Sequence, residues 1–301
     1  MIALDRVLFP TDDAPCADRA FAHAAFLADH LGATLEVLRL KPVTGTEPGT
    51  PHRYETPDGV ARVDTTRQVA SVPEAIVEAA READLVVMGT HGRRGLRRAV
   101  VGSTTEHVLH HLDCPVLAVG VEAARETPTD VDRILVPTDF SASSAVALTL
   151  ADGLAALYDA HVDLLHAVHL PNLPEVYGLG SQLAASVPEV RARTEAALGS
   201  LARRYIDPAR LGAIEVSPGP PAAVILEAAD RLGAGLLVMP THGRTGLERL
   251  ALGSVAESVL RRAPCAVLAI PSYGRFPLTD AADVPRPVAR PRPEALALHD
   301  T

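Results

Sequence analysis

The chain contains the same sequence pattern twice, and this repeat limits its fold more than any other feature. The segment Arg6–Asp12 (RVLFPTD) returns as Arg133–Asp139 (RILVPTD), 127 positions later, and the offset holds without a gap over 35 positions. A second block, Ala83–Val119, matches Ala234–Ile270 at an offset of 151, with 20 of its 37 positions identical. The sequence therefore predicts two copies of one domain in tandem.

Each copy alternates short apolar runs with amphipathic stretches, which is typical of parallel βαβ units. We therefore expect an α/β fold: two tandem open five-stranded parallel sheets with helices on both faces, whose strands are continuous apolar runs. The predicted strands of the first copy are Arg6–Phe9, Thr34–Leu40, Ala61–Arg67, Leu85–Met88 and Val116–Val119. Its predicted helices are Cys16–Leu31, Val72–Glu82 and Ser103–Leu112.

The second copy is longer, because its second offset exceeds the first by 24 residues. The extra residues fall between its second and fourth strands and predict a helix over Val187–Tyr205, where the first copy has only the Pro- and Gly-rich loop Pro42–Gly59. We expect domains at residues 1–121 and 130–271, joined by a polar linker, and a Pro-rich tail at 272–301 that is extended or disordered.

Composition narrows the class of protein. The formal charge of −9 argues against nucleic-acid binding, and no apolar run is long enough to span a membrane. The first residues lack the layout of a signal peptide, so a cytoplasmic protein is expected. The three cysteines have no partner at metal-ligand spacing and are interpreted as small buried hydrophobic residues.

The segment from Met88 to Glu106 leaves an apolar strand, loops out and enters a helix. Glycines at 89, 92 and 102 allow close approach of backbone N–H groups to an anion, and Ser103 lies at a helix start that favours negative charge. Ser103 and Glu106 also match a capping box, which Ser254 and Glu257 repeat, so both serines are expected to cap their helices whether or not an anion binds.

The segments Pro10-Thr11-Asp12, Gly89-x2-Gly92-x9-Gly102-Ser103 and Cys114–Val119, in this order and repeated, resemble those of the universal stress protein family. The resemblance covers residues 4–271 and implies a Rossmann-like sheet of order 3-2-1-4-5 in each copy, of the kind found in adenine nucleotide alpha hydrolases. It implies an adenine nucleotide as ligand, ATP with or without Mg²⁺, and leaves AMP and ADP open. In the family the fifth strands form the subunit contact, so Val116–Val119 and Val267–Ile270 are expected to meet within the chain, with a homodimer as a further option.

The resemblance also implies the residues of the site in the first copy. Gly89, Gly92, Gly102 and Ser103 would hold the phosphates, and Pro10, Thr11 and Asp12 would flank the base and ribose, with Leu40 against adenine. The other predicted members are Met88, His91, Arg93 and Thr104. A carboxylate at Asp12 can accept hydrogen bonds from both ribose hydroxyls; the alternative is a turn residue.

The second copy departs from the motif at Pro240, which stands where the first copy has Gly89. Proline lacks the N–H donor and has a fixed φ, so we expect a reshaped loop entry and leave nucleotide binding there open. Its candidate residues are Pro137, Thr138, Asp139, Ala167, Gly243, Gly253 and Ser254.

These features favour a nucleotide-binding protein of the stress response, regulatory or protective, with no catalytic residues and at most slow ATP hydrolysis. His91 and His242 occupy equivalent loop positions, but spacing places no carboxylate or nucleophile beside them. His107 and His111 have metal-ligand spacing without the Glu of H-E-x-x-H, so a solvated helix face is expected and no metal site. Two alternatives stay open: a slow ATPase or nucleotidyl-transfer enzyme on the same fold, and an interaction module that binds no nucleotide.

Overall fold

The computed structural model of the chain describes residues 2–13, 17–43, 52–90, 102–120, 128–168, 180–242, 252–271 and 275–278, with the backbone alone at 180–187. We call residues 2–120 the first half and 128–271 the second half. The elements of the first half are β1 (Arg6–Thr11), α1 (Asp18–Leu31), β2 (Thr34–Pro42), β3 (Arg62–Val69), α2 (Val72–Ala79), β4 (Leu85–Gly89), α3 (Ser103–His111) and β5 (Val116–Val119). Those of the second half are β6 (Arg133–Pro137), α4 (Ala142–Tyr158), β7 (His161–Val168), α5 (Gly180–Tyr205), β8 (Leu211–Pro218), α6 (Pro221–Leu232), β9 (Leu236–Pro240), α7 (Ser254–Arg262) and β10 (Ala266–Ile270).

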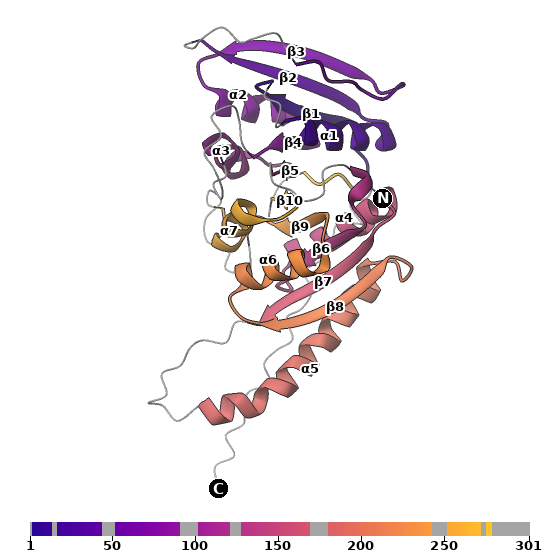
Figure 1. The fold of residues 1–301 in the computed structure, drawn as a ribbon, viewed down its shortest axis with the longest axis vertical. Coiled ribbons are helices and arrows are strands. Elements are labelled where there is room, and N and C mark those ends of the chain that lie inside the picture. Colours follow the sequence, from indigo (N-terminus) through magenta and orange to yellow (C-terminus); the bar gives the residue numbers. More distant parts are fainter. Residues whose placement is uncertain are drawn as a thin grey trace.

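All ten strands form one sheet in the order β3-β2-β1-β4-β5-β10-β9-β6-β7-β8 (Figure 1). Each half contributes five parallel strands in the expected order 3-2-1-4-5, so the α/β class and this order are confirmed. The two five-stranded sheets join into one, because the two fifth strands meet within the chain: β5 and β10 pair antiparallel, with Leu117 opposite Leu268. Both strands are buried along their whole length, so pairing gives their free edges backbone partners that water cannot supply.

Helices cover both faces of the sheet, and alternate strand residues supply the two halves of the core. On β1, Val7 and Phe9 belong to the core layer on the face that α1, α4 and α5 cover, whereas Leu8 belongs to the layer on the opposite face, with α2, α3, α6 and α7. This alternation follows from the two-residue period of a strand. The core therefore lies in two layers, one on each face of the sheet.

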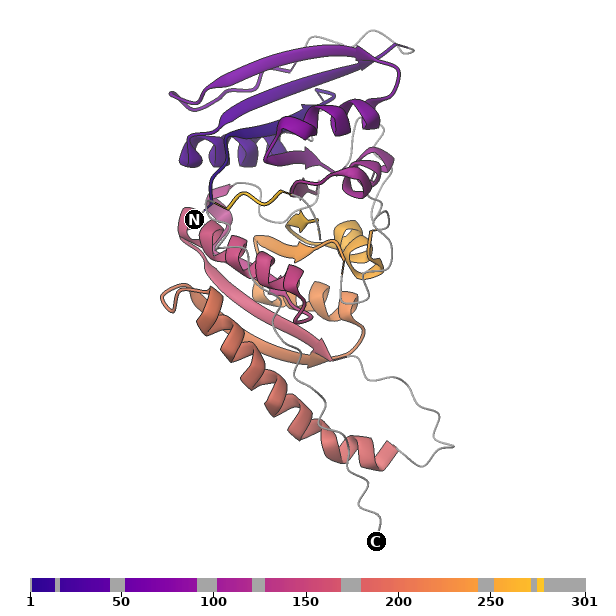
Figure 2. The same cartoon turned by 180° about the vertical axis from the view of Figure 1, so that it is seen from behind.

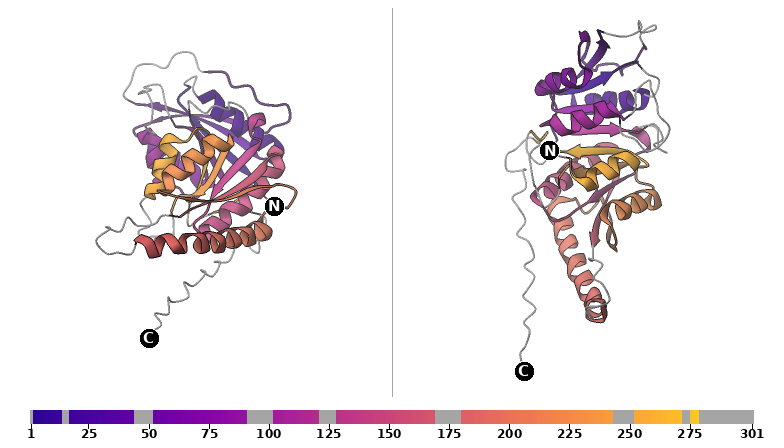
Figure 3. Two further views of the ribbon diagram at one scale, coloured as in Figure 1. Left: turned by 60° about the horizontal axis from the view of Figure 1, so that its bottom comes forward. Right: turned by 90° about the vertical axis from the view of Figure 1, so that its left-hand side faces the viewer.

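The two halves differ at β3 and β8, the outer strands of the sheet. In the second half, the long helix α5 covers β7 and β8, and Leu198, Leu201 and Ala202 are buried there. It starts at Gly180, seven residues before the predicted start, and extends beyond the sheet (Figures 2 and 3). In the first half the described residues between β2 and β3, 52–61, are irregular, in agreement with the predicted absence of a helix.

Strand β3 is not the buried apolar run that the sequence pattern predicts. Its sequence RVDTTRQV is half-buried or exposed at every position, and Val63 is 49% exposed. Arg62, Asp64, Thr66 and Gln68 lie opposite β2 residues on the face that α5 covers in the second half. A strand with no helix over it keeps polar side chains toward water, which explains the difference.

Beyond β10, residues Arg275–Leu278 return to the first half. Leu278 bridges to Ile2, the Ala3 N–H donates to the Pro277 carbonyl at 3.1 Å, and Arg275 donates to the Ala80 carbonyl at 2.9 Å. This stretch of the predicted tail is therefore extended and docked, because Phe276 and Leu278 pack against the core. The remainder of the tail lies outside the described residues.

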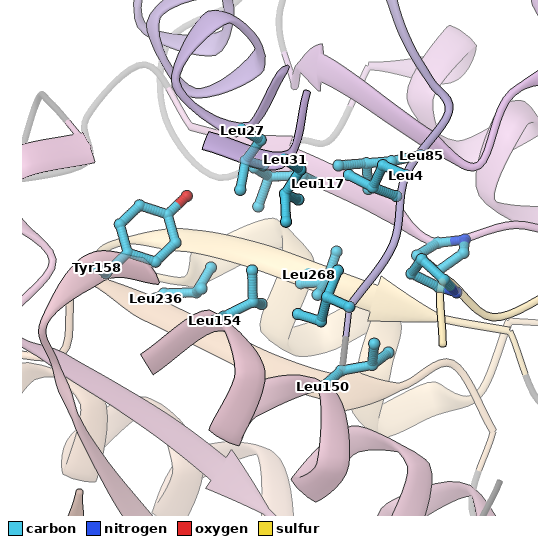
Figure 4. A pocket seen from close by; sticks show the side chains of 13 residues that line it. Leu4, Leu27, Leu31, Leu85, Leu117, Leu150, Leu154, Tyr158, Leu236 and Leu268 are labelled. Atoms are coloured by element: carbon cyan, nitrogen blue, oxygen red, sulfur yellow. The ribbon is translucent and has the colours of Figure 1, made fainter. Parts of the chain in front are cut away.

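An apolar cavity of ≈ 30 Å³ lies between the halves (Figure 4). Leu27, Leu31 and Leu117 line it from the first half, and Leu154, Tyr158 and Leu268 line it from the second. Tyr158 stacks on Phe26 of α1 with ring centroids 4.8 Å apart. The contact between halves is thus an apolar core that continues across the β5–β10 pair.

The remaining differences from the predicted elements are small. Helix α1 begins at Asp18, and α2 stops at Ala79 and continues as a 3-10 turn over Ala80–Glu82. Cys114 and Cys265 are buried free thiols, and burial raises the pKa of Cys114 to about 12, whereas Cys16 lies outside the described residues. Among the described residues, no helix is long and apolar enough to cross a membrane.

Candidate functional site

The predicted site residues of the first half come together where β1, β2 and β4 end. Parallel strands run in the same direction, so the strands that carry Thr11, Leu40 and Gly89 end at the same edge of the sheet, and α3 starts at that edge. Ligands of open parallel sheets bind at this carboxyl edge. His91, Gly92 and Arg93 lie outside the described residues.

Gly102 holds the start of α3 against the end of β4. Its N–H donates to the Thr90 carbonyl at 2.9 Å, and the Thr90 N–H in turn donates to the Val119 carbonyl at 3.0 Å. A Cβ on Gly102 would lie 3.0 Å from the Thr90 carbonyl oxygen, so a side chain would press against backbone. The third glycine of the motif therefore has a packing reason of its own, independent of any ligand.

The predicted capping box is wrong in both halves. Gly102 is the N-cap of α3 with φ −61° and ψ 145°, and Gly253 is that of α7, so Ser103 and Ser254 are the first residues inside their helices. A glycine cannot cap with a side chain, and neither helix has a side-chain cap among the described residues. Ser103 is exposed and Thr104 half-buried, so the first-turn N–H groups of α3 face the strand ends without a side-chain acceptor.

The repeated Pro-Thr-Asp sequence forms the same turn after β1 and β6. Thr11 Oγ1 accepts the Asp13 N–H at 3.0 Å, and Thr138 Oγ1 accepts the Phe140 N–H at 3.1 Å. Asp13 and Phe140 both have left-handed backbones, with φ of 58° and 62°. The threonine and the residue two positions later thus build a turn that reverses the chain at the strand end.

The aspartates in the middle of the two turns have different surroundings. In the second half, Asp139 Oδ1 accepts the Ser141 N–H at 3.0 Å and the Ser144 hydroxyl at 2.7 Å. The sequence offset places alanines, Ala14 and Ala17, at the positions of these two serines in the first half. Asp12 is exposed, which matches a carboxylate that is accessible to a ligand.

A polar cluster stands beside Asp12, formed by β2, β3 and the segment 52–57. Tyr54, 5% exposed, places its hydroxyl 2.7 Å from Thr11 Oγ1, and Arg39 donates to Asp13 Oδ1 at 3.1 Å and to Asp64. Burial opposes the charge of Arg39, but hydrogen bonds with Asp64 and Asp13 raise its pKa. Burial raises the pKa of Tyr54 to about 12, and the Arg62 hydrogen bond lowers the pKa of Asp64. The phenol therefore stays neutral and both ion-pair partners stay charged near neutral pH.

The apolar members of the predicted site belong to the core. Leu40 is 6% exposed and Met88 5% exposed, and both pack with α2 and α3, while Pro10 is also buried. Thr105, one residue beyond the predicted set, donates its hydroxyl to the Gly89 carbonyl at 3.3 Å. These residues support the strand ends, at which Asp12 and Ser103 are exposed.

The second half has the same frame at its strand ends. The Gly253 N–H donates to the Thr241 carbonyl at 2.9 Å, and the Thr241 N–H donates to the Ile270 carbonyl at 2.8 Å, as their counterparts do in the first half. Pro240 ends β9 in ladder with Ile270, so the expected reshaping of the loop entry is absent from the described backbone. Pro137 and Thr138 are buried and Ala167 half-buried, whereas Gly243 lies outside the described residues.

The histidines considered as candidates in the sequence have different surroundings. His91 is outside the described residues; His242 Nδ1 lies 3.0 Å from Thr241 Oγ1, and its Nε2 is buried with no partner among the described atoms. The rings of His107 and His111 stack 4.1 Å apart, and His111 Nδ1 lies 2.7 Å from the His107 carbonyl oxygen. Among the described residues, no group of three or more His, Cys, Asp or Glu side chains is placed to hold a metal ion.

Sequence reasoning missed three residues at this edge: Tyr54, Arg39 and Ser144. Tyr54 belongs to a loop with no counterpart in the second half, so comparison of the copies gave no signal for it. The comparison of the copies does give a signal for Arg39 and Ser144. The offset of 127 aligns Arg39 with His166 and Ser144 with Ala17, and both differences lie beside the shared turn.

Comparison with known proteins agrees with this architecture. A protein of unknown function from Pseudomonas aeruginosa PAO1 has a TM-score of 0.68 at 19% identity, covering 89% of this chain and 93% of that one. A universal stress protein from Archaeoglobus fulgidus has a TM-score of 0.60 at 18% identity, covering 88% and 98%. At such identities the likeness concerns the fold.

Sequence comparison reaches further. A universal stress protein of Mycobacterium tuberculosis is 28% identical over 193 residues, which are 64% of this chain and 63% of the relative's own length. A universal stress protein of Methanocaldococcus jannaschii is 34% identical over 140 residues, covering 46% of this chain and 81% of the relative. The model of the Universal stress protein family matches residues 52–120 and 130–271. The chain therefore belongs to the universal stress protein family.

Proposed function

We propose that the first half binds an adenine nucleotide, ATP with or without Mg²⁺. The bound nucleotide changes the contacts that this protein makes, and the protein acts in the stress response in a regulatory or protective role. The start of α3 carries the proposal. Gly102 brings the helix against the end of β4 without a side-chain cap, so the N–H groups of Ser103 and Thr104 and the helix dipole are available to a phosphate.

Asp12 supports the same ligand from the other side of the edge. It is exposed at the end of β1, where a carboxylate can accept hydrogen bonds from the two hydroxyls of a ribose. Phosphate donors at the start of α3 and a sugar acceptor after β1 together match the polarity of a nucleotide, which has an anionic end and a hydroxyl-bearing centre.

The chemistry of the site favours binding over turnover. Ser103 is exposed at a helix start, and among the described residues no histidine hydrogen-bonds it as the general base that activation of a nucleophile requires. We propose at most slow hydrolysis of ATP.

The second half serves, in this proposal, mainly as the partner domain. Its Asp139 already accepts two hydrogen bonds on Oδ1, and Pro240 removes an N–H donor. The domain limits 1–121 and 130–271, a cytoplasmic location and dimerisation of whole chains belong to the same proposal.

Ser103→Pro tests the proposed donors at the start of α3 with little cost to folding. Proline is well tolerated as the first helical residue, and Gly102 has the extended ψ of 145° that a residue before proline needs. Loss of a donor to a charged group should weaken ATP binding by roughly tenfold or more in isothermal titration. Ser254→Pro, after Gly253 with ψ 139°, is the matched control and should leave binding unchanged.

A second variant and an assay of phosphate release distinguish this proposal from its alternatives. Ser103→Ala removes the hydroxyl and keeps the N–H, so near-wild-type binding assigns the effect to the backbone. Release of many phosphate equivalents per chain would favour an enzyme. A wild-type chain that takes up no ATP at millimolar concentration would overturn the proposed function.

A further inference from the structure

We propose that Tyr54 is the positioning residue for Asp12 and so sets the ability of the site to recognise ribose, an inference that rests on the nucleotide binding proposed above. Tyr54 lies in the segment that replaces a helix in the first half. It has no counterpart in the second half and no place in the family motif quoted from the sequence.

The hydroxyl of Tyr54 fixes the turn that carries Asp12. It lies 2.7 Å from Thr11 Oγ1, and the same oxygen accepts the Asp13 N–H at 3.0 Å. Asp13 is held in turn by Arg39, whose Nε donates to Asp13 Oδ1 at 3.1 Å. Both neighbours of Asp12 are therefore pinned, which restricts the direction in which its carboxylate leaves the backbone.

The core fixes the position of the Tyr54 ring. The ring stacks on Phe21 at 4.6 Å between centroids and meets the edge of Phe9 at 5.3 Å, and the residue is 5% exposed. Arg39 lies over the same ring, with Cζ 5.8 Å from the centroid. A ring held on three sides gives its hydroxyl little freedom, so the bond to Thr11 acts as a rigid brace.

In the second half, the turn after β6 is held by hydrogen bonds to the aspartate itself. Ser144 Oγ accepts the Asp139 N–H at 3.2 Å and donates to Asp139 Oδ1 at 2.7 Å. Ala17 stands in place of this serine in the first half, so the equivalent hydroxyl is absent there and Tyr54 braces the turn through Thr11 instead. The consequence is a carboxylate that is aimed by its neighbours and accessible to sugar hydroxyls.

The test compares ATP with 2′-deoxyATP, since the second ligand lacks one hydroxyl that Asp12 would bind. A hydrogen bond to a carboxylate predicts that the wild-type chain binds ATP about tenfold tighter than 2′-deoxyATP. Tyr54→Phe keeps the stacked ring and removes the brace. We expect its ATP affinity to fall about three- to tenfold, with 2′-deoxyATP much less affected, so that the ratio approaches one.

Tyr158→Phe is the matched control, because Tyr158 is a half-buried tyrosine whose hydroxyl also has a polar neighbour, His23 Nδ1 at 3.4 Å, but it lies between the halves. Its ratio should equal that of the wild type. A ratio that stays near ten in Tyr54→Phe, even with a lowered Tm, would reduce Tyr54 to a packing residue and overturn the inference alone. Absence of ATP binding by the wild type would overturn the proposed function together with it.

Discussion

The outer strands of the two halves show how one sheet topology can be completed in two ways. In the second half, the 26-residue helix α5 covers β7 and β8 with apolar side chains. In the first half, a single buried tyrosine and the ion pairs of Arg39, Arg62 and Asp64 occupy the corresponding face. Among the described residues, a compact polar cluster therefore takes the place of apolar burial in the first half, and that cluster lies next to the strand ends where a ligand is expected.

The turns after β1 and β6 differ in the residues that support their aspartate. The threonine and the left-handed residue are common to both, whereas the support of the aspartate changed from two serines to Tyr54 and Arg39. We infer that the turn of the first half is held by side chains from outside the turn, whereas that of the second half is held through its aspartate. Variants on the two sides of this comparison should therefore differ in their effects.

Tyr54→Ala should destabilise the first half as strongly as a core deletion in α5 destabilises the second. Removing the ring leaves a cavity against Phe9 and Phe21, so we expect a loss of about 3–4 kcal/mol in the free energy of unfolding. Leu201→Ala in α5 should cost about 2–4 kcal/mol, and Val190→Ala, 43% exposed on the same helix, about 0.5 kcal/mol or less. Urea unfolding measures all three; a loss below about 1 kcal/mol for Tyr54→Ala would mean that the segment is incidental to the fold.

The ion pairs Arg133–Asp163 and Arg6–Glu36 are counterparts in the repeat but differ in burial. Asp163 is 1% exposed and accepts two hydrogen bonds from Arg133 and one from the Ala213 N–H, whereas the Glu36 contact with Arg6 is 3.5 Å long. Asp163→Ala should cost about 2–3 kcal/mol because it leaves three part-buried donors unpaired. Glu36→Ala should cost below about 1 kcal/mol, because Arg6 is 40% exposed and keeps its pair with Glu82. Equal losses by thermal or urea unfolding would remove this asymmetry between the halves.

The helices that meet between the halves also differ, since His23 of α1 stands where α4 has Leu150. Burial lowers the pKa of His23 from 6.5 to about 4, although Asp130 acts in the opposite direction. The unfolded chain therefore takes up a proton that the folded chain refuses, so this stability is present above pH 6.5 and is lost as the pH falls toward 4. Between pH 7 and pH 5 the loss should be about 2 kcal/mol larger in the wild type than in His23→Gln. Parallel pH dependences in urea unfolding would show that His23 is protonated without penalty.

Much of the fold could be predicted from the repeat alone. The two offsets placed the extra helix of the second half, and alternating apolar runs indicated parallel strands. The order of those strands was predicted from the resemblance to the universal stress protein family, and the structure has that order. The polar strand β3 could not be recognised as uncovered, because its exposure depends on the absence of a helix elsewhere in the chain. The cap positions of α3 and α7 were wrong by one residue, since they depend on the ψ of a glycine and not on the Ser-x-x-Glu spacing.

The candidate site was predictable where both copies share residues and not where they differ. Pro-Thr-Asp and Gly-Ser stand out because they occur twice, and the structure gives each a turn or a close approach that explains the residue type. Tyr54 reaches Thr11 across 43 positions from a segment without periodicity, so neither spacing nor self-comparison could place it. The packing role of Gly102 also means that Gly102→Val would disturb the loop itself, and that Ser103→Pro is the cleaner variant.

The most direct test of the asymmetry is the number of ATP molecules bound per chain, measured by isothermal titration on the wild type, Asp12→Asn and Asp139→Asn. We expect one molecule per chain, binding weakened by roughly tenfold or more in Asp12→Asn, and unchanged binding in Asp139→Asn. Two equivalent sites, or a loss of binding confined to Asp139→Asn, would contradict it.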